Sequence, residues 1–145
     1  MPSDIAAAFE RAPLLAERVA ARVDPNDPID HVIAIAREEL SAMSEAQRIA
    51  VLDAHPRIGG DSRALSALSR SEQGEDVGPA VLATLNDEYE RKFGFRFVVF
   101  MAGRDKAQII PILRSRLTRS RDAELAAAVE EFLAITRDRL SKGPL

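Results

Sequence analysis

Residues 82–101 are LATLNDEYERKFGFRFVVFM, and the two halves of this stretch favour different backbone conformations. Large apolar side chains recur in its first half at the three- and four-residue spacing of one helix face, at Leu82, Leu85, Tyr89 and Phe93. Gly94 follows them, and glycine is the residue type that most often ends a helix. From Phe93 onward the sequence is aromatic and β-branched, which favours extended backbone. No second stretch of this kind is available to pair with it, so we predict a helix followed by an isolated extended segment.

The rest of the chain carries further helix signals. Capping boxes mark two helix starts, at Ser44 and Asp105, because each has a glutamine three residues later. Asp27, just ahead of a proline, suggests another N-cap. The sequence therefore predicts an all-α, single-domain, multi-helix bundle over residues 1–145, with one short extended segment near residues 95–101.

An isolated extended segment leaves backbone N–H and C=O groups that need hydrogen-bond partners. Helix ends, water or a ligand could supply them, and a polar heterocycle with amide-like edges would be a good match. The alternative is a buried connector wedged between helices. Both interpretations are compatible with the residues.

Composition and charge narrow the class of protein. The formal net charge is −3, whereas a nucleic-acid binder needs a basic surplus. The chain has no cysteine, which excludes disulfides and thiolate chemistry. No stretch approaches the roughly 18 apolar residues of a membrane span, and the acidic start does not resemble a secretion signal. We expect a cytoplasmic protein with neither nucleic acid nor membrane as a partner.

His55, in LDAHPRIGG at residues 52–60, is the first candidate for chemistry. A residue before proline is pushed out of the α region, so the helix that begins near Ser44 should end at about Ala54. His55 would then lie at or just past the helix C-terminus, where the dipole favours a protonated imidazole. That state suits a proton donor or an anion ligand. A histidine that only caps helix carbonyls is the alternative.

The second histidine, His31, falls in the first turn of another predicted helix. We interpret it as a surface or packing residue. The two histidines have no metal-ligand spacing, so we expect no metal site.

The stretch SRSEQ at residues 69–73 is the second candidate. Ser69 and Glu72 fit a capping box, but little helix-forming sequence follows them. Ser69, Glu72 and Gln73 could instead surround a small polar ligand. Glu72 near His55 would also stabilise an imidazolium.

Arginines gather in two places near the end of the chain. The run RSRLTRSR at residues 114–121 is typical of a solvated helix end. Arg137 and Arg139 lie near the last turn of the final predicted helix, where one of them could bind a carboxylate.

Taken together, four stretches resemble the 2-oxo-4-hydroxy-4-carboxy-5-ureidoimidazoline (OHCU) decarboxylase family in their order and motifs. These are AHPRIGG, SRSEQ, LNDEYERKFGFRFVV and ITRDRL. Any one of the motifs alone is weak, whereas the set is specific and covers nearly the whole chain. The resemblance implies an all-α carbon–carbon lyase of urate degradation, which converts OHCU to (S)-allantoin and carbon dioxide without metal or organic cofactor.

The resemblance also implies roles for individual residues. His55 would be the catalytic acid or base, and Glu72 its partner. The residues implied in substrate binding are Pro56, Ser69, Arg70, Ser71, Gln73, Phe97, Val98, Val99, Phe100, Met101 and Arg139. OHCU would be the small-molecule partner, and a homodimer is compatible with the resemblance.

Two departures from the family pattern concern the rim of the implied pocket. The stretch GEDVGPAV at residues 74–81 is shorter than the family's, and Arg96 stands where many members have proline. Two rival functions remain open: a non-enzymatic helical binding or interaction module, and a hydrolase of a related ureide.

Overall fold

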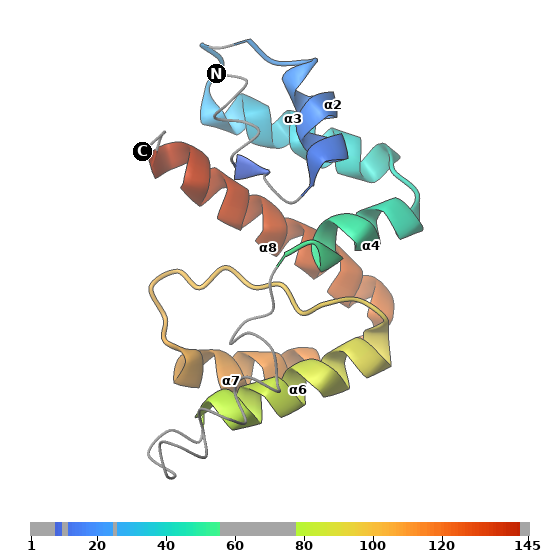
Figure 1. Cartoon of the computed structure of the whole chain (residues 1–145), viewed down its shortest axis with the longest axis vertical. Coiled ribbons are helices and arrows are strands. Elements are labelled where there is room, and N and C mark those ends of the chain that lie inside the picture. Colours follow the sequence, from blue (N-terminus) through green and yellow to red (C-terminus); the bar gives the residue numbers. More distant parts are fainter. Residues whose placement is uncertain (1–7, 10–11, 25, 56–77, 143–145) are drawn as a thin grey trace. The chain divides into compact units, whose positions relative to one another are not determined.

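The computed structural model describes residues 8–9, 12–24, 26–55 and 78–142. Within these ranges the chain forms six α-helices and no strand (Figure 1). The helices are α2 (Pro13–Ala20), α3 (Ile29–Ala42), α4 (Glu45–Asp53), α6 (Gly78–Phe93), α7 (Lys106–Arg116) and α8 (Arg121–Lys142). The predicted all-α class is confirmed, and residues 94–105 join α6 to α7 without helix, as expected for the segment after Gly94.

Helix ends follow the local signals in most places. Both predicted capping boxes are present, at Ser44 for α4 and at Asp105 for α7. Gly94, at φ 83°, follows the last residue of α6, and its N–H donates to the carbonyl of Glu90. The prediction for Asp27 is wrong, because the N-cap of α3 is the next residue and the Asp27 carboxylate accepts from the N–H of Asp24 instead.

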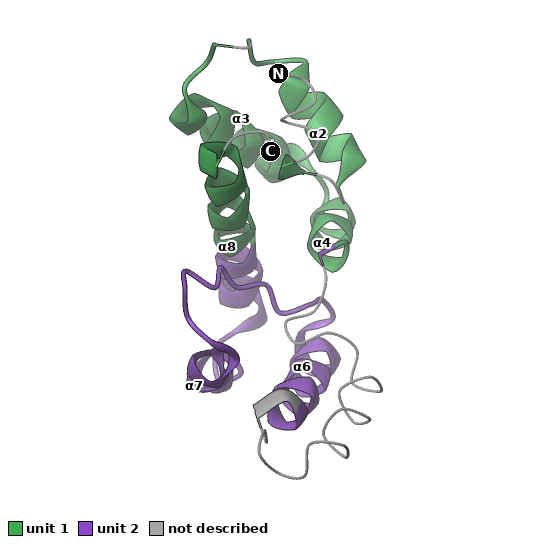
Figure 2. Cartoon of the chain, turned by 60° about the vertical axis from the view of Figure 1, so that its left-hand side comes forward, with its two compact units in different colours: residues 1–54, 129–145 green, residues 55–128 purple. Residues whose placement is uncertain are grey.

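The chain divides into two compact units (Figure 2). Unit 1 comprises residues 1–54 and 129–145, and unit 2 comprises residues 55–128. Helix α8 contributes its first turns to unit 2 and the remainder to unit 1. The single domain over the whole chain stays a prediction.

Unit 1 packs α2 and α3 together with the C-terminal part of α8. Its core is mainly aliphatic and includes Leu15, Val19, Val32, Ile35 and Leu40. Phe9 meets Phe132 of α8 with ring centroids 6.2 Å apart. On the surface of the same unit, Arg37 of α3 forms a two-pronged ion pair with Glu130 of α8.

Unit 2 places α6 beside α7, with the non-helical segment between them in the chain (Figure 1). Its core is strongly aromatic. The rings of Phe93, Phe95 and Phe97 lie 4.6, 5.9 and 5.2 Å, centroid to centroid, from the ring of Tyr89. All four side chains are at least 98% buried. The aromatic residues that predicted an extended segment therefore anchor it to α6.

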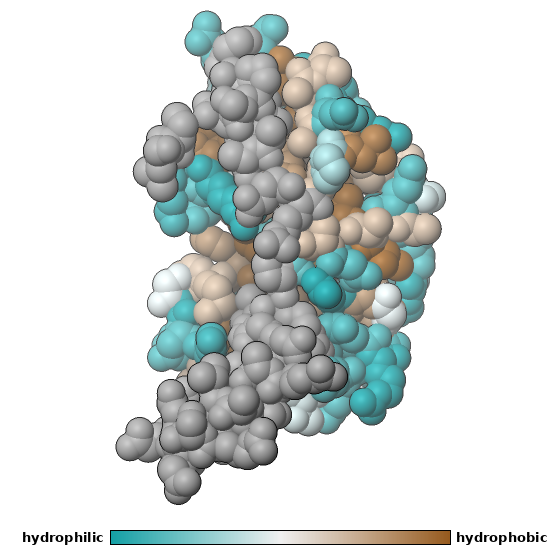
Figure 3. All heavy atoms as spheres, in the orientation of Figure 1, coloured by the Kyte–Doolittle hydropathy of each residue, from teal (hydrophilic) through white to brown (hydrophobic). Residues whose placement is uncertain are grey.

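The described surface is mixed in character. Figure 3 shows one face, on which hydrophilic residues in teal lie among smaller hydrophobic groups in brown. Within the described ranges, one large hydrophobic side chain is exposed, that of Leu14. None of the helices there is long and apolar enough to cross a membrane.

Candidate functional site

His55 lies directly after the end of α4. The helix runs from Glu45 to Asp53, and Ala54 is its C-cap, with its N–H donating to the carbonyls of Ala50 and Leu52. The helix therefore stops where the following proline predicts. His55 is half-buried, so its side chain has both protein and solvent around it.

Arg96 joins His55 to the non-helical segment of unit 2. Its Nη1 donates to the backbone carbonyl of His55 at 2.7 Å, across 41 positions of sequence. Because the donor is a guanidinium, the hydrogen bond is charge-assisted and stronger than one between neutral groups. Two stretches selected separately from the sequence, the one at His55 and the one at residues 95–101, are thus in direct contact.

The segment itself is mostly buried. Phe97, Val98 and Val99 are 1%, 3% and 3% exposed, while Phe100 and Met101 are half-buried. Their backbone groups consequently have limited access to water, and each must find a partner in the protein or in a ligand.

Two arginines hold three carbonyls of this segment. Arg116 Nη1 donates to Val98 O at 2.9 Å. Arg104 donates through Nη2 to Phe100 O at 2.6 Å and through Nε to Met101 O at 3.1 Å. These three carbonyls therefore already accept from charged donors of the protein, and the role of this segment's backbone in binding a substrate stays a prediction.

The N–H groups of the same segment are in a different situation. Among the described residues, those of Val98 and Val99 have no hydrogen-bond acceptor. The peptide bonds are trans, so the N–H of Val99 points away from the Val98 carbonyl and hence away from Arg116. By drawing electrons toward the carbonyl, Arg116 also makes the N–H of that peptide a better donor.

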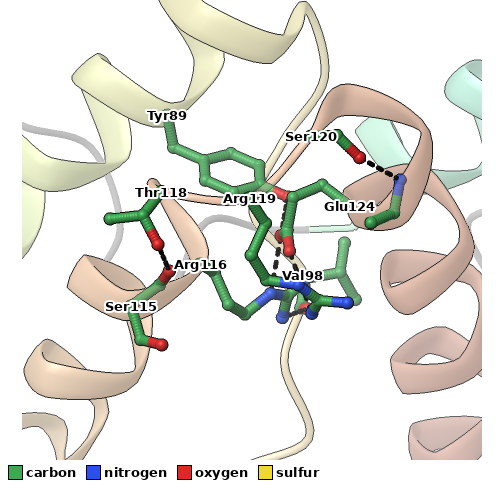
Figure 4. Close-up of polar contacts among 9 residues, drawn as sticks. Tyr89, Val98, Ser115, Arg116, Thr118, Arg119, Ser120 and Glu124 are labelled. Atoms are coloured by element: carbon green, nitrogen blue, oxygen red, sulfur yellow. Dashed lines mark hydrogen bonds and ion pairs between the residues drawn. The ribbon is translucent and has the colours of Figure 1, made fainter.

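A polar cluster around the buried carboxylate of Glu124, formed with Tyr89, Arg116 and the exposed Arg119, fixes Arg116 in place (Figure 4). Glu124 is 0% exposed, and its Oε1 accepts from the Tyr89 hydroxyl and from Arg116 Nε, each at 2.7 Å. Arg119 forms an ion pair with the other carboxylate oxygen at 3.2 Å. Burial, and then the hydrogen bond to Glu124, raise the pKa of Tyr89 far above its ordinary value.

The guanidinium of Arg116 also lies over two rings of the aromatic core. Its Cζ is 4.7 Å from the ring centroid of Phe97 and 5.9 Å from that of Tyr89. The interpretation of residues 114–121 as a solvated helix end is wrong for Arg116, which is only 7% exposed. A run of arginines does not reveal which member turns inward, because the buried carboxylate that selects it lies on another helix.

Several predicted site residues fall outside the described residues. Pro56 and the stretch Ser69, Arg70, Ser71, Glu72 and Gln73 belong to this group. Their roles, including the pairing of Glu72 with His55, remain predictions.

Arg139 and Arg137 belong to unit 1, and the structure distinguishes them. Arg137 is exposed and forms an ion pair with Asp30 of α3. Arg139 is half-buried and donates through Nη1 to the carbonyl of Ala8 at 3.3 Å. Arg137 already pairs with a carboxylate, whereas Arg139 donates to a neutral carbonyl, so of the two arginines Arg139 remains the better candidate for a carboxylate ligand.

His31 is exposed on α3, as predicted, with its Nε2 3.7 Å from the Asp27 carboxylate. Over the ranges that the structure describes, no three side chains of the metal-ligating types His, Cys, Asp and Glu come together.

The sequence and the fold both have counterparts among known proteins. Residues 3–141 match the family described as "OHCU decarboxylase". The "Uric acid degradation bifunctional protein" of Bacillus sp. (strain TB-90) is 27% identical over 139 residues, which cover 86% of this chain and 26% of that protein. The chain thus spans about a quarter of that relative. The "2-oxo-4-hydroxy-4-carboxy-5-ureidoimidazoline decarboxylase" of Halalkalicoccus jeotgali is 27% identical over 141 residues, 92% of this chain and 79% of that protein.

A solved structure supports the fold. The crystal structure of an OHCU decarboxylase in the presence of (S)-allantoin superposes with a TM-score of 0.73 and 23% sequence identity, covering 94% of each chain. At this level of identity the likeness establishes the fold.

Proposed function

This chain belongs to the OHCU decarboxylase family, and we propose that it removes carbon dioxide from OHCU to form (S)-allantoin. The observation that carries the proposal is the family match over residues 3–141, which includes every residue selected for the site. The order of the four stretches that resemble the family, AHPRIGG, SRSEQ, LNDEYERKFGFRFVV and ITRDRL, supports it.

The proposed chemistry needs groups that stabilise negative charge. Loss of carbon dioxide leaves an electron pair that must spread into the carbonyl and nitrogen system of the ring. Fixed donors aimed at such charge commonly contribute several kcal/mol to lowering a barrier. The N–H of Val99 suits this role, because it has no acceptor among the described residues and its peptide carbonyl is bound by Arg116.

We assign the proton transfer to His55. A proton must reach one face of the ring to set the configuration of the product, which is the work of a positioned acid or base. The half-buried location of His55 beyond the end of α4 supports this role, because such a side chain can contact both protein and substrate. Glu72 would orient the imidazole and stabilise its charged form.

The remaining residues would bind the substrate. We propose that Pro56, Ser69, Arg70, Ser71 and Gln73 contact the ring and ureido group, that residues 97–101 contribute backbone groups, and that Arg139 binds the carboxylate. The reaction would need no cofactor. The single domain, the homodimer and the cytoplasmic location also stay predictions.

A coupled assay tests the activity directly. Urate, urate oxidase and hydroxyisourate hydrolase generate OHCU in place, and circular dichroism follows the appearance of optically active allantoin. The chain should accelerate this signal, and exhaustive chelation should leave the rate unchanged. His55→Ala should lose most of the rate while keeping its helical spectrum.

Glu72→Gln separates a catalytic role from a capping role, because it keeps the size of the side chain and removes its charge. A residue that only caps a helix would cost about 1 kcal/mol of stability and little rate. We expect the reverse, a large loss of rate with a small change in melting. Consumption of OHCU without allantoin would favour a ureide hydrolase, and no acceleration at all would favour a binding module.

A further inference from the structure

Arg96 has a backbone that the core holds in place. Its neighbours in sequence, Phe95 and Phe97, are each 1% exposed and pack against Tyr89 with ring centroids 5.9 and 5.2 Å away. Arg121 adds a cation–π contact, with its Cζ 5.6 Å from the ring centroid of Phe95. Because Phe95 and Phe97 are both held in the core, the Cα atom from which the Arg96 side chain extends is fixed in position.

The target, the backbone carbonyl of His55, lies just beyond the regular hydrogen bonding of a helix. The hydrogen bonds of α4 end at its C-cap, Ala54, one residue before His55. The residue after His55 is a proline, which has no N–H to donate into a following turn. Arg96 Nη1 supplies a charge-assisted hydrogen bond to the His55 carbonyl at 2.7 Å, in a partly buried position.

The hydrogen bond from Arg96 to the backbone carbonyl of His55 affects where the His55 imidazole lies. The imidazole is carried by the Cα atom next to the carbonyl that Arg96 holds, so a displacement of that carbonyl moves the ring with it. Misplacing a catalytic group by about 1 Å can cost about a hundredfold in rate. The effect should appear in turnover and leave substrate affinity nearly unchanged.

From these contacts we propose that Arg96 is a positioning residue for His55, and that it helps to fix the backbone from which the imidazole acts. The inference rests on the proposed function for its effect on rate. The contact itself, however, joins two residues of the same compact unit and can be tested without any substrate.

The variants are Arg96→Met, which keeps length and loses the donors, and Arg96→Lys, which keeps a charged donor. Arg114→Met is the matched control, because Arg114 is exposed on α7 in the same unit. The chain has two histidines, so proton–carbon spectra of the imidazole rings contain two sets of signals, with His31 of unit 1 as an internal reference.

In Arg96→Met we expect the His55 ring signals to shift or broaden while those of His31 stay fixed. In the coupled assay, kcat should fall by about ten- to a hundredfold with KM little changed. Arg96→Lys should restore part of both effects, and Arg114→Met should match the parent in both.

Two results would overturn the inference. One is an Arg96→Met spectrum in which His55 keeps its parent signals. The other is a variant in which the His31 signals and the melting temperature change together with those of His55, which would indicate a general loss of structure. If the parent chain forms no allantoin, the proposed function fails, and the ring spectra alone still decide whether Arg96 positions His55.

Discussion

Raising the pH should destabilise this protein through Tyr89, the one tyrosine in its sequence. The side chain is 0% exposed, and its hydroxyl donates to the buried carboxylate of Glu124 at 2.7 Å. Burial and this hydrogen bond raise the pKa of Tyr89 in the folded protein. The folded state therefore keeps a proton that the unfolded chain releases.

The size and sign of the effect follow from proton linkage. An unfolded tyrosine titrates at about pH 10, so below that pH both states are protonated and the stability is fully present. Above it, the unfolded state alone loses the proton, and the free energy of unfolding should fall by about 1.4 kcal/mol per pH unit. At about pH 12 the loss would approach 3 kcal/mol, a large share of the 5–15 kcal/mol that stabilises a typical protein.

Denaturant unfolding at a series of pH values from about 8 to about 12 would measure this slope. Tyr89→Phe is the control, because lysines and arginines titrate alike in both proteins and the difference isolates the tyrosine. Tyrosinate absorbance adds an independent record, since it should appear only as the helical signal is lost. Ionisation of Tyr89 with a midpoint near pH 10 in a protein that stays helical would refute the reasoning.

Three further predictions concern the same unit. Arg116→Met should lower the free energy of unfolding by about 3 kcal/mol, at the low end for a broken buried ion pair because Glu124 keeps two other partners; denaturant melts equal to those of Arg114→Met would contradict this. Ala102→Gly should raise the free energy of unfolding by about 0.5–1 kcal/mol, because Ala102 has φ 52°; a lower melting temperature would count against it. Val99→Pro should weaken allantoin binding in calorimetry while Val99→Ile preserves it, and a natively melting proline variant that binds like the parent would reduce the segment to a buried connector.

The features that the sequence predicts well are those decided by near neighbours. The capping boxes at Ser44 and Asp105 and the helix end at Gly94 depend on residues within three or four positions, and all are present. Asp27 is the exception. A carboxylate just before a proline can accept from N–H groups of the helix that follows or from an N–H of the preceding turn, and Asp27 accepts from the N–H of Asp24.

The features that could not be predicted depend on distant partners. Nothing within the local sequence indicates that Arg116 is the arginine of its run that is buried, where it pairs with Glu124 and donates to the carbonyl of Val98. The contact from Arg96 to the carbonyl of His55 likewise spans 41 positions. Sequence motifs selected the stretches at His55 and at residues 95–101, but the side chain that joins them is identified only in the folded chain.

Unit 1 is built from two segments that are far apart in the sequence, residues 1–54 and 129–145, and this has a consequence for its biosynthesis. Phe9 packs on Phe132, and Arg37 pairs with Glu130 across 93 positions of sequence. At translation rates of 5–20 residues per second, roughly 5 to 20 s separate the synthesis of Arg37 from that of Glu130. During that interval the apolar faces of α2 and α3 lack the last helix that covers them, whereas unit 2 is continuous in sequence and has all of its residues by Ala128. We therefore expect residues 1–54 to depend more on chaperones during synthesis than unit 2 does, even though they are made before it.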